Sequence, residues 1–253
     1  MPFEVVTVPC LEDNYAYLVH SADGVAIIDA PEAAPIIAAL EERGWPPGVI
    51  MITHHHWDHV QAVDELKAKY GCPVMGPKAE EDKIKKLDMA LDDGFSGGTD
   101  DGLCQVMSVP GHTLGHIAYY YPKGGAVFTA DSLMALGCGR LFEGTPDMMW
   151  ESLSKLAALP PETMVYSGHE YTMGNAKFAL TIDPDNAALT SRIQDIETAR
   201  AENKPTAQVP LSLELATNPF LRASDPGIRK GLGLEDATDA DVFAEIRARK
   251  DNF

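Results

Sequence analysis

The sequence predicts an α/β protein in which a mixed α/β core is followed by a mainly helical C-terminal part. Short β-prone runs alternate with helical periodicity through the first two-thirds of the chain. Histidine and aspartate residues follow the ends of several of these runs, and from about residue 172 the pattern becomes helical. With 253 residues, of which 45% are apolar, the chain can form one large core with a smaller appendage.

The elements follow in order along the chain. We expect a helix over 32–43 that ends at Gly44, and a second helical period from Val60 until Gly71. Beyond residue 172, apolar spacing predicts one helix near 189–196, and Thr238 is the expected N-cap of another. Strands are expected at 3–8, 15–20, 24–29, 49–52, 73–75, 103–109, 117–121, 126–130 and 163–166.

Composition limits the classes of partner. The formal net charge of −18 opposes binding to nucleic acid, because a polyanion would be repelled across most of the surface. The four scattered cysteines, without a CxxC pair, predict reduced and mostly buried thiols. The chain shows no signal-peptide pattern and no apolar stretch near the roughly 20 residues that span a bilayer. We expect a cytoplasmic monomer that acts on a small molecule, without a membrane partner.

The segment Thr53-His54-His55-His56-Trp57-Asp58-His59 follows an apolar strand and carries the strongest chemical signal. Residues two apart in an extended segment point to the same side, so His54 and His56 can bind one ion. As the chain turns into the next helix, Asp58 and His59 can reach a second ion. Imidazole and carboxylate ligands suit zinc, iron or manganese, and we expect two divalent ions with zinc as the first choice.

Three further candidates each follow a predicted strand, at the edge where α/β sheets bind their ligands: His112, Asp131 and His169. His112 would complete the ligands of the ion at His54 and His56, His169 would join Asp58 and His59, and Asp131 can bridge. Two such ions lower the pKa of a shared water and polarise a carbonyl, which predicts hydrolysis by hydroxide. We expect Asp58 and Asp131 to be the catalytic carboxylates.

Three residues near these candidates are not counted among the metal ligands. Asp29 either supports this site or caps the helix that follows it, and the pattern leaves both readings open. His55 and His116 are not needed as metal ligands. His55 should point away from its neighbours, because it alternates with His54 and His56 along the segment.

This ordered set of metal-ligand candidates resembles the motif of the metallo-β-lactamase superfamily. Within it, the chain is similar to the glyoxalase II (hydroxyacylglutathione hydrolase) family over nearly its whole length. The more specific marks are Asp13-Asn14-Tyr15, Gly137–Gly144, Gly168–Thr172, Asn218–Arg222 and the terminal Arg247–Phe253. The resemblance implies an αββα sandwich, a metallo-β-lactamase-like catalytic domain over 1–172, and a helical glutathione-binding domain over 173–253.

The resemblance also implies an activity and the residues that bind its substrate. It implies a hydrolase of glutathione thioesters in methylglyoxal detoxification, which converts S-D-lactoylglutathione, a 2-hydroxyacylglutathione, and water to D-lactate and glutathione. The residues that match glutathione-binding positions are Arg140, Tyr171, Arg247 and Lys250. Three residues depart from the family pattern: Phe142 replaces a tyrosine, Arg140 a lysine, and Ala130 a glycine beside Asp131.

Three alternative functions use the same residues differently. A glutathione persulfide dioxygenase would need a single iron and one complete set of ligands. Another hydrolase of the same fold, such as a lactonase or β-lactamase, would not require the basic C-terminal end. A metal-binding protein without turnover would need closed coordination, whereas seven ligands for two ions leave positions open.

Overall fold

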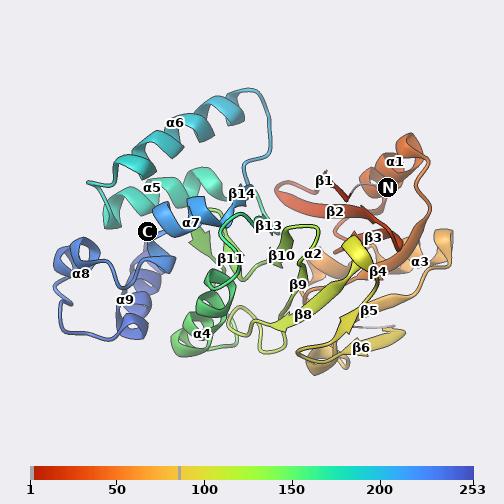
Figure 1. The fold of residues 1–253 in the computed structure, drawn as a ribbon, viewed down its shortest axis with the longest axis horizontal. Helices are drawn as coiled ribbons and strands as arrows, with labels where there is room; N and C mark the ends of the chain where they lie inside the picture. The colour runs from red at the N-terminus through yellow and green to blue at the C-terminus, as the bar shows by residue number, and fades with distance from the viewer. Residues whose placement is uncertain (1–2, 85–86) are drawn as a thin grey trace. The chain divides into compact units, whose positions relative to one another are not determined.

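The computed structural model describes residues 3–84 and 87–253, and the chain divides into two compact units. Unit 1 comprises Met1–Ser108 and Leu114–Thr129. Unit 2 comprises Val109–Thr113 and Ala130–Phe253, so the short segment 109–113 belongs with the C-terminal half of the chain. Figure 1 labels the α-helices and most of the strands of both units.

The first sheet of unit 1 begins as an antiparallel meander and continues as parallel strands. Its order is β1-β2-β3-β4-β5-β6, and β3 to β6 run parallel. The strands are β1 (Glu4–Cys10), β2 (Asn14–Ser21), β3 (Gly24–Ile28), β4 (Pro47–Met51), β5 (Val74–Pro77) and β6 (Met89–Leu91). Parallel neighbours need crossover connections, and helices supply them. These helices are α1 (Ala33–Arg43), α2 (Trp57–Val60), α3 (Val63–Tyr70) and the 3₁₀ helix η1 (Lys78–Glu80).

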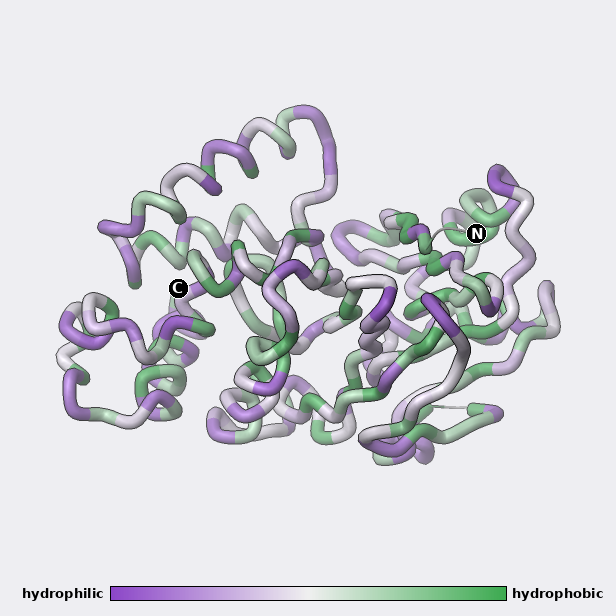
Figure 2. The backbone as a smooth tube through the Cα atoms, in the orientation of Figure 1, coloured by the Kyte–Doolittle hydropathy of each residue, from purple (hydrophilic) through white to green (hydrophobic). Residues whose placement is uncertain are grey.

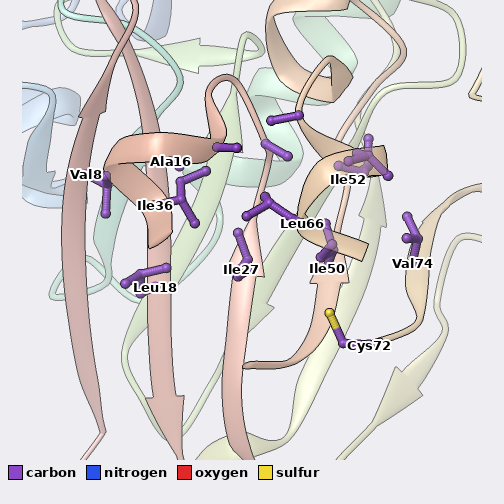
Figure 3. Close-up of a cluster of buried hydrophobic side chains, with 14 of the residues drawn as sticks. Val8, Ala16, Leu18, Ile27, Ile36, Ile50, Ile52, Leu66, Cys72 and Val74 are labelled. Carbon is purple, nitrogen blue, oxygen red and sulfur yellow. The ribbon is translucent and has the colours of Figure 1, made fainter. Parts of the chain in front are cut away.

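One face of this sheet forms an apolar core of unit 1. Figure 3 shows Leu18, Ile27 and Ile50 on the strands, directed toward Ile36 of α1 and Leu66 of α3. All five side chains are at most 1% exposed. Because alternate residues of a strand point to opposite faces, the chain neighbours of these core residues face the other side of the sheet.

A second sheet lies against that other face within unit 1. Its strands are antiparallel neighbours in the order β7 (Ser96–Gly97), β8 (Cys104–Ser108), β9 (Ile117–Tyr121) and β10 (Ala126–Ala130), and η2 (Asp100–Gly102) lies between β7 and β8. The rings of Tyr17 and Phe128 are 5.4 Å apart, and the Tyr121 hydroxyl donates to Met51 Sδ at 3.5 Å. Unit 1 is therefore layered as helices, sheet and sheet.

Unit 2 is mainly helical. Its helices are α4 (Pro146–Ala157), α5 (Thr172–Ile182), α6 (Ala187–Ala201), α7 (Leu211–Thr217), η3 (Pro219–Leu221), α8 (Pro226–Leu232) and α9 (Asp239–Asp251). Its short strands are β11 (Leu133–Met134), β12 (Gly137–Cys138), β13 (Met164–Ser167) and β14 (Gln208–Pro210). Leu136, Ala179, Leu189 and Ile196 pack together between α5 and α6. Figure 2 shows hydrophilic residues recurring along α6, which buries a narrow stripe.

Most of the expected elements are confirmed, and the differences have local causes. Thr238 caps α9 in a capping box with Asp241, as predicted. The expected helix from Val60 to Gly71 is divided into α2 and α3. The strands that were not anticipated, β6, β7, β11, β12 and β14, have two or three residues each, too few to show alternation. The helices α4, α5, α7 and α8 were not anticipated individually, although α4 has a recognisable start, since Thr145 caps it.

Two expectations from composition can be compared with the structure. All four cysteines are buried and none forms a disulfide, as expected. Within residues 3–84 and 87–253, no helix is both long enough and apolar enough to cross a membrane.

Candidate metal centre

Four of the expected ligands gather in unit 1, and we call them the unit 1 ligand set: His54, His56, Asp58 and His59. His54 Nε2 lies 3.2 Å from His56 Nδ1, and the rings of His54 and His59 are 4.2 Å apart. His59 Nε2 lies 3.9 Å from Asp58 Oδ2. His54 and His59 are fully buried, so their ring orientation is set by packing. The segment after β4 therefore brings its imidazoles together as predicted.

Asp29 holds the unit 1 ligand set by hydrogen bonds. Its Oδ2 accepts from His59 Nδ1 at 2.8 Å and from the Thr53 hydroxyl at 2.8 Å, and its Oδ1 accepts from the Thr53 amide at 2.8 Å. The N-cap of α1 is Glu32, and no side chain caps that helix. Of the two roles left open for Asp29, the structure favours support of the site.

Asn14 is a supporting residue whose role the sequence did not predict. Its side-chain amide donates to Asp58 Oδ2 at 3.0 Å and to the Asp58 carbonyl at 3.2 Å. Both bonds restrict the carboxylate of Asp58. The only signal in the sequence was the family mark Asp13-Asn14-Tyr15, which names the residue and not its partner.

The remaining ligands gather in unit 2, and we call them the unit 2 ligand set: His112, Asp131 and His169. Asp131 Oδ2 lies 3.3 Å from His112 Nε2 and 3.3 Å from His169 Nε2. All three side chains are buried. Gly139 passes close behind them, because a Cβ at this position would lie 1.9 Å from the Asp131 carbonyl oxygen. Only glycine permits this approach.

The hydrogen bond of His112 directs one ring nitrogen toward the other members of the unit 2 ligand set. His112 Nδ1 lies 2.8 Å from the carbonyl oxygen of Arg140, which can only accept. Nδ1 therefore carries a proton, and Nε2 faces the Asp131 carboxylate at 3.3 Å. In the neutral ring, the lone pair of Nε2 would coordinate a cation held beside this carboxylate.

The spacing of these donor atoms also fits a metal ion. Tetrahedral coordination at 2.0–2.1 Å places neighbouring ligand atoms about 3.3 Å apart. The two contacts of Asp131 Oδ2, both 3.3 Å, match this edge, as does the 3.2 Å between His54 and His56 nitrogens. These pairs of donor atoms are thus spaced as neighbouring ligands of a divalent ion, with imidazole nitrogen and carboxylate oxygen as donors.

Ala130, the residue that departs from the family's glycine, adopts a backbone conformation typical of glycine. Its φ is +41°, in the left-handed region. The residue ends β10, and its carbonyl accepts from the Gly168 amide at 3.0 Å, one residue before His169. The turn that presents Asp131 therefore contains a strained alanine.

His55 and His116 lie beside the ligand candidates and contact other side chains. His55 Nδ1 lies 2.9 Å from Glu80 Oε2. Glu80 was not among the candidate site residues predicted from the sequence. The His116 ring stacks on the His54 ring, with centroids 4.6 Å apart and an angle of 17° between the planes.

The four expected glutathione-binding residues lie in two places within unit 2. The ring of Tyr171 is 42% exposed and stacks on His169, with centroids 4.7 Å apart. The guanidinium groups of Arg140 and Arg247 lie 3.6 and 2.8 Å from Asp251 Oδ1. Lys250 directly precedes Asp251 in α9. The sequence analysis did not select Asp251, which the structure places between the two guanidinium groups.

Arg247 differs from the other cations in its burial. It is 5% exposed, and its guanidinium donates to the Cys138 carbonyl at 3.0 Å and lies over the Phe220 ring. Arg140 is 60% exposed, and Lys250 is partly exposed. Burial lowers the pKa of the Lys250 ammonium, and the nearby charge of Arg247 lowers it further.

Two family models together match nearly the whole chain. Residues 11–169 match the metallo-β-lactamase superfamily, and residues 170–253 match the C-terminus of hydroxyacylglutathione hydrolase. The chain is 59% identical to the hydroxyacylglutathione hydrolase of Ruegeria pomeroyi and 58% identical to that of Roseobacter denitrificans, with 100% of both chains covered in each case. The enzyme of the same name from Mesorhizobium japonicum is 52% identical, again over the full lengths.

Solved structures show the same fold. The B3 metallo-β-lactamase BLEG-1 matches with a TM-score of 0.67 and 23% identity, over 86% of this chain and 99% of its own. TTHA1623, solved in a di-iron-bound form, matches with a TM-score of 0.62 and 28% identity, over 86% of this chain and 100% of its own. The expected metallo-β-lactamase fold with a C-terminal helical part is confirmed.

Proposed function

Because the chain belongs to the hydroxyacylglutathione hydrolase family of the metallo-β-lactamase superfamily, we propose that it hydrolyses S-D-lactoylglutathione to D-lactate and glutathione. The full-length similarity to enzymes of that name carries this proposal. The seven expected ligands support it, since each falls in one of two sets of imidazoles and carboxylates, and five of the seven side chains are buried. The protein is therefore a thioester hydrolase that acts on a small molecule.

We assign the ligands as the sequence suggested. His54, His56 and His112 would hold one ion, Asp58, His59 and His169 would hold the other, and Asp131 would be shared between them. Bound divalent ions lower the pKa of a coordinated water and polarise the thioester carbonyl. Zinc is our first choice, and the di-iron-bound relative makes iron the first alternative to test.

The residues around the ligands prepare their donor atoms. His59 donates its Nδ1 proton to Asp29, so the lone pair for coordination is on Nε2. Asn14 restricts the rotation of Asp58. The Oδ2 of Asp131 is equally distant from His112 and His169, which our assignment gives to different ions, and this symmetry supports a bridging role.

The departing group is a thiolate. Because the pKa of a thiol lies far below that of an alcohol, no dedicated acid is needed to release it.

We propose residues 173–253 as the glutathione-binding domain and 1–172 as the catalytic domain. Within the former, Lys250 is partly exposed and its charge suits a substrate carboxylate, and Arg140 and Tyr171 are exposed in unit 2. The buried Arg247 contributes by holding α9 in place. A cytoplasmic, monomeric enzyme stays a prediction.

Thiol release from S-D-lactoylglutathione, measured with elemental analysis of the same sample, tests the function. We expect turnover with two divalent ions per chain. Asp58→Ala and Asp131→Ala should abolish turnover and lower the metal content, because each removes a ligand. The exposed Asp195→Ala is the matched control and should change neither.

The alternatives give different results in the same experiment. Oxygen consumption with glutathione persulfide, together with one iron per chain, would indicate a dioxygenase. Metal-loaded protein that leaves every thioester and ester intact would indicate a binding protein. Wild-type turnover in the Asp131→Ala variant would refute the assignment of the site.

A further inference from the structure

The unit 1 ligand set is held at its centre by a buried carboxylate. Glu80, the last residue of η1, is 1% exposed. Its Oε2 accepts from the His55 amide at 2.7 Å and lies 2.9 Å from His55 Nδ1. One carboxylate oxygen thus holds both the backbone and the ring of the residue between His54 and His56.

The other oxygen of Glu80 reaches a second loop of unit 1. Glu80 Oε1 accepts from the Gly115 amide at 3.1 Å. A Cβ on Gly115 would lie 2.3 Å from Glu80 Cγ and 3.0 Å from Ala79 Cβ. The absence of a side chain at residue 115 therefore makes the space that the Glu80 side chain occupies.

This second loop continues onto the ligands themselves. His116 follows Gly115 and stacks on the His54 ring, and the Ile117 amide donates to the Thr53 carbonyl at 3.0 Å. Glu80 accordingly connects the two loops that enclose His54. A buried carboxylate is costly unless it is hydrogen-bonded, and the three contacts of Glu80 offset that cost.

We propose that Glu80 is a positioning residue for the metal ligands His54 and His56, an inference that rests on the proposed function. The amide and ring of His55 are held on one side of the extended segment, so the side chains of its two neighbours are directed to the other side. Glu80 belongs to neither of the two ligand sets. It acts by limiting the rotation of the ligand segment. Without Glu80, the imidazoles of His54 and His56 would become ordered only when the metal binds, and this ordering would weaken metal binding.

Cobalt(II) binding to the metal-free protein tests this role directly. We would titrate cobalt(II) and follow its visible absorption, which reports both affinity and ligand geometry, in wild type, Glu80→Gln and Glu80→Ala. Loss of a partner of this kind typically weakens metal binding about 10–100-fold, which we expect for Glu80→Ala. Glu80→Gln should fall between the two, because its oxygen can still accept from His55 while its amide group opposes the Gly115 amide.

Two further variants complete the design. Gly115→Ala leaves the carboxylate intact and displaces it, so it should also weaken cobalt binding and alter the spectrum. Glu81→Gln changes the exposed neighbouring residue and should behave as wild type. If Glu80→Ala does not fold, Glu80→Gln and Gly115→Ala decide the matter.

The outcomes separate this inference from the proposed function. Wild-type protein that binds no cobalt would refute the metal site itself. If wild type binds cobalt and the folded Glu80 and Gly115 variants match its affinity and spectrum, the positioning role is wrong. The same conclusion follows if the variants lower only the melting temperature of the metal-free protein, which is what a purely structural residue would do.

Discussion

Asp29 binds both ends of the ligand segment, since its Oδ2 accepts from Thr53 at 2.8 Å and from His59 at 2.8 Å. The two partners are six positions apart in sequence, and the ligands His54, His56 and Asp58 lie between them. One buried carboxylate therefore fixes the length of the loop and the orientation of the last imidazole.

Replacing Asp29 with asparagine should weaken metal binding. The side chain keeps its shape, and asparagine tolerates the left-handed φ of +57° at this position. The amide cannot accept from all three donors, so we expect an affinity loss of about 10–100-fold. Competition with a chromogenic zinc chelator measures it, and the exposed Asp195→Asn serves as the control. An unchanged zinc affinity in folded Asp29→Asn would contradict this role.

Because Ala130 has a left-handed backbone conformation, its replacement by glycine should change the free energy of unfolding very little. A left-handed alanine costs about 1–2 kcal/mol. Glycine removes this strain but loses a buried methyl group, about 0.8 kcal/mol, and adds freedom to the unfolded chain. Ala130→Gly should thus be nearly neutral for the free energy of unfolding, whereas Ala118→Gly within β9 should destabilise by about 1 kcal/mol or more. Urea unfolding of both variants checks the difference, and equal losses would contradict the strain.

Arg247 should matter more for stability than its neighbour Arg249. Arg247→Met leaves the buried Cys138 carbonyl without its donor, so we expect a loss of about 2 kcal/mol in the free energy of unfolding. Arg249 forms an exposed pair with Glu245 at 2.8 Å, and Arg249→Met should cost less than about 0.5 kcal/mol. Urea unfolding measures both. Similar stabilities would show that the guanidinium of Arg247 is not needed for packing.

Lys250 should give the KM for the substrate a dependence on pH. Below its pKa the ammonium is charged and can attract a carboxylate, and above it this attraction is lost. Because burial lowers that pKa, KM should begin to rise at a lower pH than an ordinary lysine would cause, while kcat stays constant. Lys250→Arg keeps its charge and should remove the rise. A wild-type KM that does not change through the alkaline range would contradict the role of Lys250.

The sequence predicted the chemical groups of the site well, since each ligand candidate follows a strand that the hydrophobic pattern also predicts. It could not choose between two roles for Asp29, because both require the same residue at the same place. It also missed Glu80, which is 25 residues from His55 and lies in a three-residue 3₁₀ helix with no periodicity. The spacing in Arg247–Lys250 did not indicate that Arg247 is buried while Lys250 is partly exposed.

By itself, the sequence determined the longer strands, the order of the histidines and aspartates, and the family to which they belong. These properties are local, because strand and helix patterns depend on neighbours within a few residues. The tertiary structure decided which nitrogen of His59 and His112 carries a proton, which carboxylates support the ligands, and where alanine adopts a left-handed turn. Each of these depends on atoms brought together from distant positions, and packing alone sets their distances.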